Sequence, residues 1–179
     1  MVARIDELLF YLFFNLSADS PVLEPLMVTI TNWSGYFYAA VYVSVIVFLL
    51  WRKSKDAVPV IVAPALAFSL VHVARQLYFR PRPFYALEID SLIYHAANSS
   101  LPSLHATSAF VIAAVIWCFH KKLGTALLVI AGVVGISRVM VGVHFPLDIA
   151  AGAILGATIA LGSFKLNQLL FNKYRNETC

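Results

Sequence analysis

The sequence predicts an all-α integral membrane protein, built as a helical bundle of five or six transmembrane helices. Of its 179 residues, 61% are hydrophobic and only 12% are charged, and its mean hydropathy is +0.83. A soluble domain is about 45–50% apolar and about 25% charged. One compact core cannot bury so large an apolar excess, so lipid is the expected solvent for much of this chain.

Five apolar stretches account for the expected spans, since a helix needs roughly 20 apolar residues to cross a bilayer. Residues 28–51 and 57–74 carry no formal charge, and residues 101–119 carry none apart from a proton that His105 can bind. Residues 123–137 and 149–164 are shorter, but apolar neighbours extend both. These five stretches give the minimum number of spans.

The first apolar run, residues 8–16, is too short to cross a bilayer unaided. Three alternatives remain open for it: an interfacial helix, a re-entrant helix, or the start of a sixth span that is broken near Pro21 and Pro25. It lacks the polar leading region and the small-residue cleavage site of a removable signal peptide. We therefore expect it to stay in the protein.

The basic residues between and after the spans predict the topology. They gather at three places: Arg52, Lys53 and Lys55; Lys121 and Lys122; and Lys165, Lys173 and Arg175. By the positive-inside rule these places face the cytoplasm, so the polar stretch at residues 80–110 faces outward. The formal net charge of +4 then reflects topology rather than nucleic-acid binding. Because the chain shows no repeat and no linker, we expect a single membrane-embedded domain over residues 1–179.

Polar side chains near the ends of the spans are expected to meet at the outer face. Charges within a membrane cost about 2.5–3.5 kcal/mol on insertion scales and usually serve a function. Because successive spans alternate in direction, three clusters reach the same end of the bundle: Arg75 and Arg82; Ser103 and His105; and Arg138, His144 and Asp148. Their joint arrival predicts one site.

Each of these residues also has a structural explanation when it is taken singly. An arginine near the end of a span can extend its charge to the lipid headgroups. Ser103 is a good N-cap and Pro146 a good first residue for a helix. Only their convergence favours a functional site over these explanations.

Three arginines that converge on one pocket indicate a multiply charged anion as the ligand. Guanidinium presents fixed pairs of donors that match phosphate oxygens more specifically than lysine does. A helix that starts near Ser103 adds free backbone N–H groups and a positive dipole end. Phosphate is therefore the expected ligand.

Two histidines complete a set of residues that suits phosphoryl transfer. His144 and Asp148 are four residues apart, so one helical turn lets the carboxylate accept a hydrogen bond from one ring nitrogen and leaves the other free to attack. His105 remains as a general acid for the leaving oxygen, a role worth about 10²–10⁴-fold in rate.

The order and spacing of these residues resemble the three-part signature of the type 2 phosphatidic acid phosphatase family. The matching segments are Arg75-x6-Arg82-Pro83, Pro102-Ser103-Leu104-His105 and Ser137-Arg138-x5-His144-x3-Asp148. Two positions depart from the family pattern. Arg75 stands where Lys is usual, which keeps the charge, and Leu104 stands where Gly or Asp is usual, which removes no catalytic group.

The resemblance implies a helical bundle that hydrolyses a lipid phosphate through a phosphohistidine, with no metal and no cofactor. Carried over by position, His144 is the nucleophile, Asp148 its partner and His105 the acid that protonates the leaving group. The residues that the resemblance assigns to phosphate binding are Arg75, Arg82, Ser103 and Arg138.

Within the family, the chain is most similar to bacterial undecaprenyl pyrophosphate phosphatases of the bacitracin-resistance type. The short N-terminal apolar segment, RPRPF at residues 80–84, His-Ala-Ala at 95–97 and VGVHFPLD at 141–148 carry this similarity. It implies a multi-pass protein of the bacterial cytoplasmic membrane whose site faces outward and removes the terminal phosphate of a lipid diphosphate. Phosphatidic acid, phosphatidylglycerol phosphate and lipid A phosphates, which other members accept, stay open as substrates.

Two further histidines are candidates for the site. His95, in the outward stretch, is placed to touch a distal phosphate or headgroup. His72 precedes Arg75 by one helical turn and is placed to orient it, although a packed, hydrogen-bonded histidine is the simpler interpretation.

A metal site and a transporter are the alternatives from other classes. His105, His144 and Asp148 offer three metal ligands, but the nearby arginines repel a cation, so we expect no metal. Transporter sites lie near the midplane between repeats, whereas these charges lie at one end of the spans. The oligomeric state is left open.

Overall fold

The chain folds into seven helices within residues 2–177, the part that this computed structural model describes. They are α1 (Val2–Ala18), α2 (Leu23–Trp51), α3 (Ala57–Leu77), α4 (Pro83–Ala86), α5 (Leu104–Phe119), α6 (Lys121–Met140) and α7 (Pro146–Glu177). The side chains of Lys173 and Arg175, counted above among the basic residues, lie outside those that the structure describes. The prediction of an all-α bundle is confirmed.

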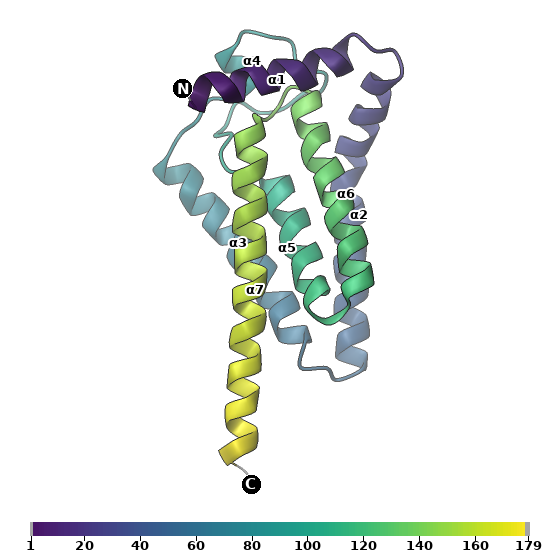
Figure 1. Cartoon of the computed structure of the whole chain (residues 1–179), viewed down its shortest axis with the longest axis vertical. Coiled ribbons are helices and arrows are strands. Elements are labelled where there is room, and N and C mark those ends of the chain that lie inside the picture. Colours follow the sequence, from purple (N-terminus) through teal and green to yellow (C-terminus); the bar gives the residue numbers. More distant parts are fainter. Residues whose placement is uncertain (1, 178–179) are drawn as a thin grey trace.

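Helix α5 lies at the centre of the bundle, where it packs against α7, α6 and α3 (Figure 1). Its sequence is apolar on every side, and its buried residues form an almost continuous run from Ala106 to Ile116. A helix that is hydrophobic all round is a buried helix. The longer helices α2, α3, α6 and α7 surround it.

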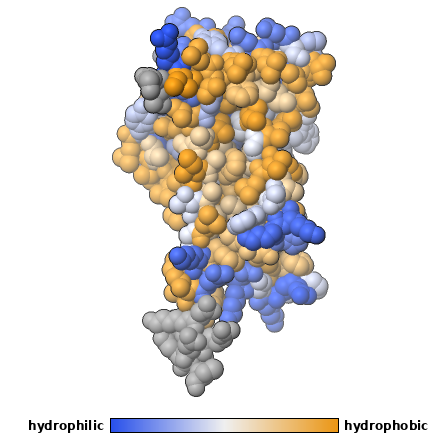
Figure 2. Space-filling model, viewed as in Figure 1, coloured by the Kyte–Doolittle hydropathy of each residue, from blue (hydrophilic) through white to orange (hydrophobic). Residues whose placement is uncertain are grey.

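Four helical segments are long and apolar enough to cross a membrane: α2, α3, α6 and residues Pro146–Phe171 of α7. Helix α5 is also apolar, but it has only 16 residues. Hydrophobic residues dominate the surface around the middle of the molecule, and polar residues gather toward its two ends (Figure 2). The chain is a multi-pass membrane protein.

Helix α1 lies across one end of the bundle rather than along it (Figure 1). Its buried residues are spaced three or four apart, as on one helix face: Asp6, Phe10, Phe14 and Ser17. The ring of Phe10 packs 5.5 Å from that of Phe145, which lies directly before α7. Of the three alternatives for residues 8–16, an interfacial helix fits this placement.

The break after α1 lies at residues 19–22. Pro21 lies inside this break, as expected. Pro25 does not, because it already belongs to the first turn of α2, where a proline removes no helical hydrogen bond.

Two glycines let α7 approach α5 closely. A Cβ atom at Gly152 would lie 2.9 Å from the carbonyl oxygen of Ser103, and one at Gly156 would lie 2.7 Å from that of Thr107. Both distances are too short for ordinary van der Waals contact. At this approach the backbone N–H of Ser103 donates to the carbonyl oxygen of Asp148 at 3.1 Å. The starts of α5 and α7 are therefore held side by side.

These two helix starts agree with the sequence signals. Ser103 is the N-cap of α5, and its hydroxyl accepts from the backbone N–H of Ala106 at 3.5 Å. Pro146 is the first residue of α7. Because α3 and α6 end where α5 and α7 begin, the polar clusters reach the end of the bundle that α1 covers (Figure 1).

Candidate active site

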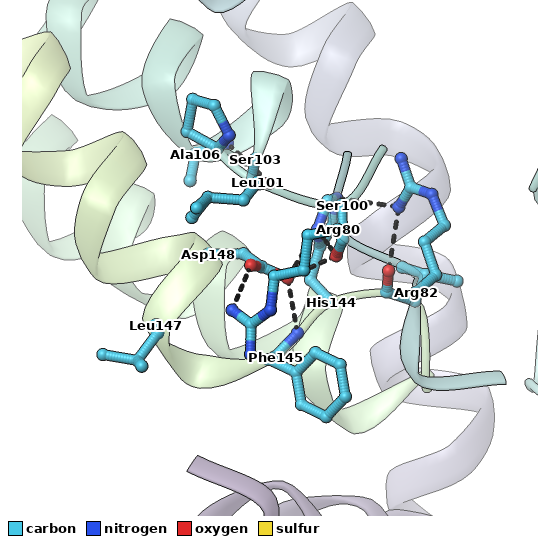
Figure 3. A network of polar contacts seen from close by, with 12 residues as sticks. Arg80, Arg82, Ser100, Leu101, Ser103, Ala106, His144, Phe145, Leu147 and Asp148 are labelled. Carbon is cyan, nitrogen blue, oxygen red and sulfur yellow. Dashed lines mark hydrogen bonds and ion pairs between the residues drawn. The ribbon is translucent and has the colours of Figure 1, made fainter. Parts of the chain in front are cut away.

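The histidine and the aspartate that are four residues apart lie in contact at the start of α7 (Figure 3). His144 Nδ1 is 3.4 Å from Asp148 Oδ2, and only 1% and 0% of the two side chains is exposed. The same Oδ2 accepts from the backbone N–H of Phe145 at 2.9 Å and from the hydroxyl of Ser100. The contact that the spacing predicts is present, but His144 lies just before α7, and the hydrogen bond from Phe145 N–H to the first-turn Asp148 brings the carboxylate beside the ring.

The opposite ring nitrogen of His144 faces Arg82. Nε2 lies 3.1 Å from Arg82 Nη1, and because a guanidinium only donates hydrogen bonds, Nε2 bears the lone pair while Nδ1 bears the proton that faces Asp148. Burial, and after it the charges of Arg82 and Arg138, lower the pKa of His144 to about 3, although Asp148 raises it. The ring is therefore neutral near pH 7, with its basic nitrogen toward the arginines.

Arg82 is the most enclosed of the arginines, with 1% of its surface exposed. Its Nε and Nη2 donate to Asn98 Oδ1 at 3.1 and 2.7 Å, and its Nη1 donates to the carbonyl oxygen of Val143 at 2.8 Å. Burial, then the charges of Arg75 and Arg138, lower its pKa to about 10, so it stays protonated at neutral pH.

The other two arginines differ in how they are bonded. Arg138 is 3% exposed, and its Nε and Nη2 have no hydrogen-bond partner among the described residues. Arg75 instead donates from Nε and Nη2 to the carbonyl oxygen of Pro102, at 3.1 and 2.8 Å. Arg75 thus holds the segment before α5, while Arg138 has two buried donors free for an anion.

His105 stands one residue inside α5 and lines a cavity of about 440 Å³. The other lining residues come from α2, α3, α5 and α6 and are mostly apolar: Ser34, Gly35, Tyr38, Ala39, Tyr42, Pro64, Ala65, Phe68, Leu104, Ser108, Ala109, Ile112 and Val134. The half-buried imidazole thus joins an apolar cavity to the polar end of the bundle. Sequence reasoning did not foresee this cavity, because it is shaped by four helices that are distant in the sequence.

The two further candidate histidines lie differently. The ring of His95 is 6.4 Å from that of His144, edge to face. Burial, and to a smaller extent the charges of Arg82, Arg138 and Arg75, lower the pKa of His95 to about 4, which places it beside the arginines. His72 is exposed, and its Nδ1 is 2.9 Å from the carbonyl oxygen of Phe68 on its own helix. Among the described contacts, none joins His72 to Arg75.

Three residues that sequence reasoning missed complete the network: Asp6, Arg80 and Ser100. Arg80 Nη1 donates to Asp148 Oδ1 at 2.6 Å, and its Nη2 donates to Asp6 Oδ2 at 2.5 Å. Two signals were present in the sequence. Arg80 is the first arginine of RPRPF, and Asp6 lies two residues before the apolar run at 8–16, where a carboxylate close to the membrane needs a partner.

Among the described residues, no group of three or more His, Cys, Asp or Glu side chains is arranged to hold a metal ion. His144 and Asp148 face each other, and the cations around them are guanidiniums. The site as built offers donors to an anion.

Comparison with known proteins places this site in a family. Residues 56–171 match the PAP2 superfamily, and they include every signature residue. The bacitracin transport permease protein BcrC of Bacillus licheniformis is 37% identical over 154 residues, which cover 84% of this chain and 74% of the relative. The undecaprenyl-diphosphatase BcrC of Bacillus subtilis strain 168 is 30% identical over 156 residues, 87% of this chain and 81% of the relative.

A solved structure agrees with the sequence matches. The transmembrane PAP2 type phosphatidylglycerolphosphate phosphatase from Bacillus subtilis superposes with a TM-score of 0.78 at 26% identity, over 93% of this chain and 86% of that chain. The resemblance drawn from the three motifs is confirmed. The chain therefore belongs to the PAP2 superfamily, and with it to the metal-independent lipid phosphatases of the membrane.

Proposed function

We propose that this phosphatase hydrolyses a lipid diphosphate, and that undecaprenyl diphosphate is its substrate, which yields undecaprenyl phosphate and phosphate. One observation carries the proposal: a buried, neutral His144 lies between Asp148 and Arg82 at an end of the bundle where His105 lines an apolar cavity. The name of the Bacillus subtilis relative, an undecaprenyl-diphosphatase, supports this choice of lipid.

The first step transfers the terminal phosphoryl group to His144. Nε2 attacks the terminal phosphorus, the bond from this phosphorus to the bridging oxygen breaks, and His105 protonates the departing oxygen of the lipid monophosphate. Before this attack, Arg82 Nη1 has to leave Nε2 and turn its donor toward a phosphate oxygen. Asp148 stabilises the positive charge that the ring gains on phosphorylation.

The second step releases phosphate. A water molecule attacks the phosphohistidine, His105 accepts a proton from this water, and the bond between phosphorus and Nε2 breaks, which restores the neutral ring. In both steps Arg75, Arg82, Ser103 and Arg138 bind the phosphate oxygens, on which negative charge builds up in the transition state. Because guanidiniums supply this stabilisation, neither step requires a divalent cation.

The apolar cavity offers a place for the start of the lipid chain. Its volume of about 440 Å³ lies within the range of small-molecule sites, and that is enough for only part of a long prenyl chain. Beyond the cavity the chain passes into the bilayer, whose hydrocarbon is as apolar as the cavity lining.

For the topology we propose five spans, α2, α3, α5, α6 and α7, in one domain over residues 1–179. Helix α1 then lies along the outer interface, and the site faces outward, in a bacterial cytoplasmic membrane. The basic residues at 52–55 and 121–122 support this orientation, because they lie at the end of the bundle opposite α1 (Figure 1).

The test is a substrate panel with purified protein in detergent. Undecaprenyl diphosphate, undecaprenyl phosphate, phosphatidic acid, phosphatidylglycerol phosphate and a lipid A phosphate are each supplied, and released phosphate is measured. We expect the highest kcat/KM on undecaprenyl diphosphate and only background release with His144→Ala. A higher kcat/KM on a glycerol-based lipid would reassign the substrate, and full activity of His144→Ala would refute the mechanism.

A transport function is tested separately, because the Bacillus licheniformis relative is named a transport permease. Proteoliposomes with purified protein are given bacitracin, and its uptake is measured against protein-free vesicles. We expect equal uptake, since the charged residues gather at one end of the bundle. Protein-dependent uptake that persists in His144→Ala would favour transport.

A further inference from the structure

Three side chains of alternating charge, Asp6, Arg80 and Asp148, connect helix α1 to the neutral ring of His144. Asp6 Oδ2 is 2.5 Å from Arg80 Nη2, Arg80 Nη1 is 2.6 Å from Asp148 Oδ1, and Asp148 Oδ2 is 3.4 Å from His144 Nδ1. Figure 3 shows Arg80 reaching the Asp148 carboxylate on the side away from Arg82. Arg80 occupies one of the six unspecified positions of the first signature motif, and Asp6 lies outside all three motifs and outside the segment that matches the family.

Arg80 is held firmly between its two carboxylates. Its guanidinium lies over the ring of Phe145, 4.5 Å from the ring centroid. Its backbone carbonyl accepts from the N–H of Ser100 at 2.8 Å, and its side chain is only 19% exposed. An arginine fixed in this way lacks the freedom that makes surface ion pairs weak.

Asp6 is fixed as well, from two sides. Its Oδ1 accepts from the backbone N–H of Leu147 in the first turn of α7, at 2.9 Å, and 2% of the residue is exposed. The carboxylate therefore caps the start of α7 with one oxygen and pairs with Arg80 through the other. In this way α1 is tied to the helix that carries Asp148.

The two oxygens of Asp148 have separate partners. Oδ1 is bonded to Arg80, whereas Oδ2 is bonded to Phe145 N–H, Ser100 and His144. We infer that Arg80 and Asp6 are positioning residues for the reaction, which act through Asp148 by keeping Oδ2 toward His144 and by setting the net charge behind it. This inference rests on the proposed function, in which His144 is the nucleophile.

Because Arg80 and Asp6 carry opposite charges, they have opposite effects on the protonation of His144. Without Arg80, Asp148 and Asp6 add two uncompensated negative charges, which favour the protonated, non-nucleophilic imidazolium. Without Asp6, the charge of Arg80 is less compensated and disfavours the imidazolium. Loss of a residue that only supports the fold would not shift the protonation of His144 in a direction set by the charge of that residue.

Other charged and titratable groups around His144 stay the same in both variants. They are Asp148 of α7, Arg82 and His95 of the loop before α5, Arg138 of α6, Arg75 at the end of α3 and His105 at the start of α5. A shift of the acid limb of the pH profile between variants can therefore be attributed to the charge of the substituted residue.

The experiment compares kcat/KM against pH for Arg80→Met and for the double variant Arg80→Met with Asp6→Asn. We expect Arg80→Met to lose up to about 100-fold, as mispositioned catalytic groups do, and its acid limb to move upward by on the order of one pH unit. The double variant should recover part of both changes, because the second uncompensated carboxylate is gone. Glu7→Gln, at an exposed position next to Asp6 on α1, is the matched control and should keep the wild-type profile.

Each outcome decides the inference. If Arg80→Met does not fold, the double variant is compared with Arg80→Lys, which keeps the positive charge. The acid limb of kcat/KM should then lie at a higher pH in the double variant than in Arg80→Lys. Additive losses with an unmoved acid limb, while His144→Ala is inactive, would overturn the roles of Arg80 and Asp6 and leave the proposed function intact. Full activity of His144→Ala would instead remove the proposed function itself.

Discussion

Arg82 Nη1 lies 3.1 Å from His144 Nε2, on the side of the ring opposite Asp148. The contact defines the tautomer of the free protein, because the guanidinium can only donate. In the proposed mechanism, it also means that the attacking nitrogen is covered until a phosphate oxygen competes for the same donor. Binding of substrate and uncovering of the nucleophile are then one event.

His144→Ala is expected to reduce phosphate release to background for every substrate, because the proposed covalent intermediate forms on this side chain. Asp148→Asn should cost up to about 10⁴-fold, because a neutral amide no longer stabilises the positive charge that the ring gains on phosphorylation. Released phosphate from purified protein measures both. His120→Asn, at the opposite end of the bundle, is the control and should stay active; comparable loss there would point to damage to the fold.

Metal removal should leave the activity unchanged. Arginines and the start of α5 already stabilise the phosphate charge, so turnover in EDTA should equal turnover in buffer. Vanadate, which adopts the five-coordinate geometry of the transition state, should inhibit. The prediction fails if EDTA abolishes phosphate release and added Mg²⁺ restores it.

The effect of His105→Ala should depend on the leaving group. A lipid monophosphate expels an alkoxide that needs a proton, a lipid diphosphate expels a phosphate oxygen that needs it less, and p-nitrophenyl phosphate needs almost none. Single-turnover rates should therefore fall most on the alkyl monophosphate and least on the aryl ester. Equal losses on all three would count against His105 as the acid.

The topology can be tested with single cysteines in a background that lacks Cys118 and Cys179. Tyr94, 97% exposed in the loop before α5, and Lys122, at the start of α6, are each replaced by Cys. A membrane-impermeant thiol reagent on intact cells should label Tyr94→Cys only. Labelling of Lys122→Cys alone would invert the proposed orientation.

Acid should destabilise the protein through His144. Its pKa of about 3 in the folded protein lies below the value of about 6.5 in an unfolded chain. Between these pH values the unfolded state binds more protons, so the free energy of unfolding falls as the pH falls, by at most about 1.4 kcal/mol per pH unit for one histidine. His144→Gln should therefore show a smaller drop in Tm from pH 6.5 to pH 4 than His120→Asn does. Identical drops in the two variants would contradict this assignment.

Much of the fold could be predicted because its signals are local. Long apolar runs, the N-cap Ser103 and the first-turn Pro146 each act within a few residues, and alternating spans then bring their ends together. The contact between His144 and Asp148 is local as well, because Asp148 in the first turn of α7 accepts a hydrogen bond from the backbone N–H of Phe145, the residue after His144. Such features need no knowledge of how the helices are rotated against one another.

The pairing of Arg80 with Asp6 could not be predicted in the same way. The two residues are 74 positions apart, and their contact depends on α1 lying across the bundle, which its short apolar run leaves undetermined. Arg75 gives a second case. Its guanidinium is expected to bind phosphate, but its Nε and Nη2 donate to the carbonyl oxygen of Pro102. These two hydrogen bonds depend on the path of the loop before α5.

In the topology proposed above, the shortness of α5 sets how deep in the membrane the reaction would take place. At about 1.5 Å per residue, its 16 residues fall about 6 Å short of a hydrocarbon layer of roughly 30 Å. Lys121 and Lys122, at the start of α6, hold the C-terminal end of α5 among the headgroups. The missing length therefore lies at the other end of α5, which carries Ser103 and His105. The substrate then has to lower its phosphates below the level of the neighbouring headgroups while its chain stays in the hydrocarbon.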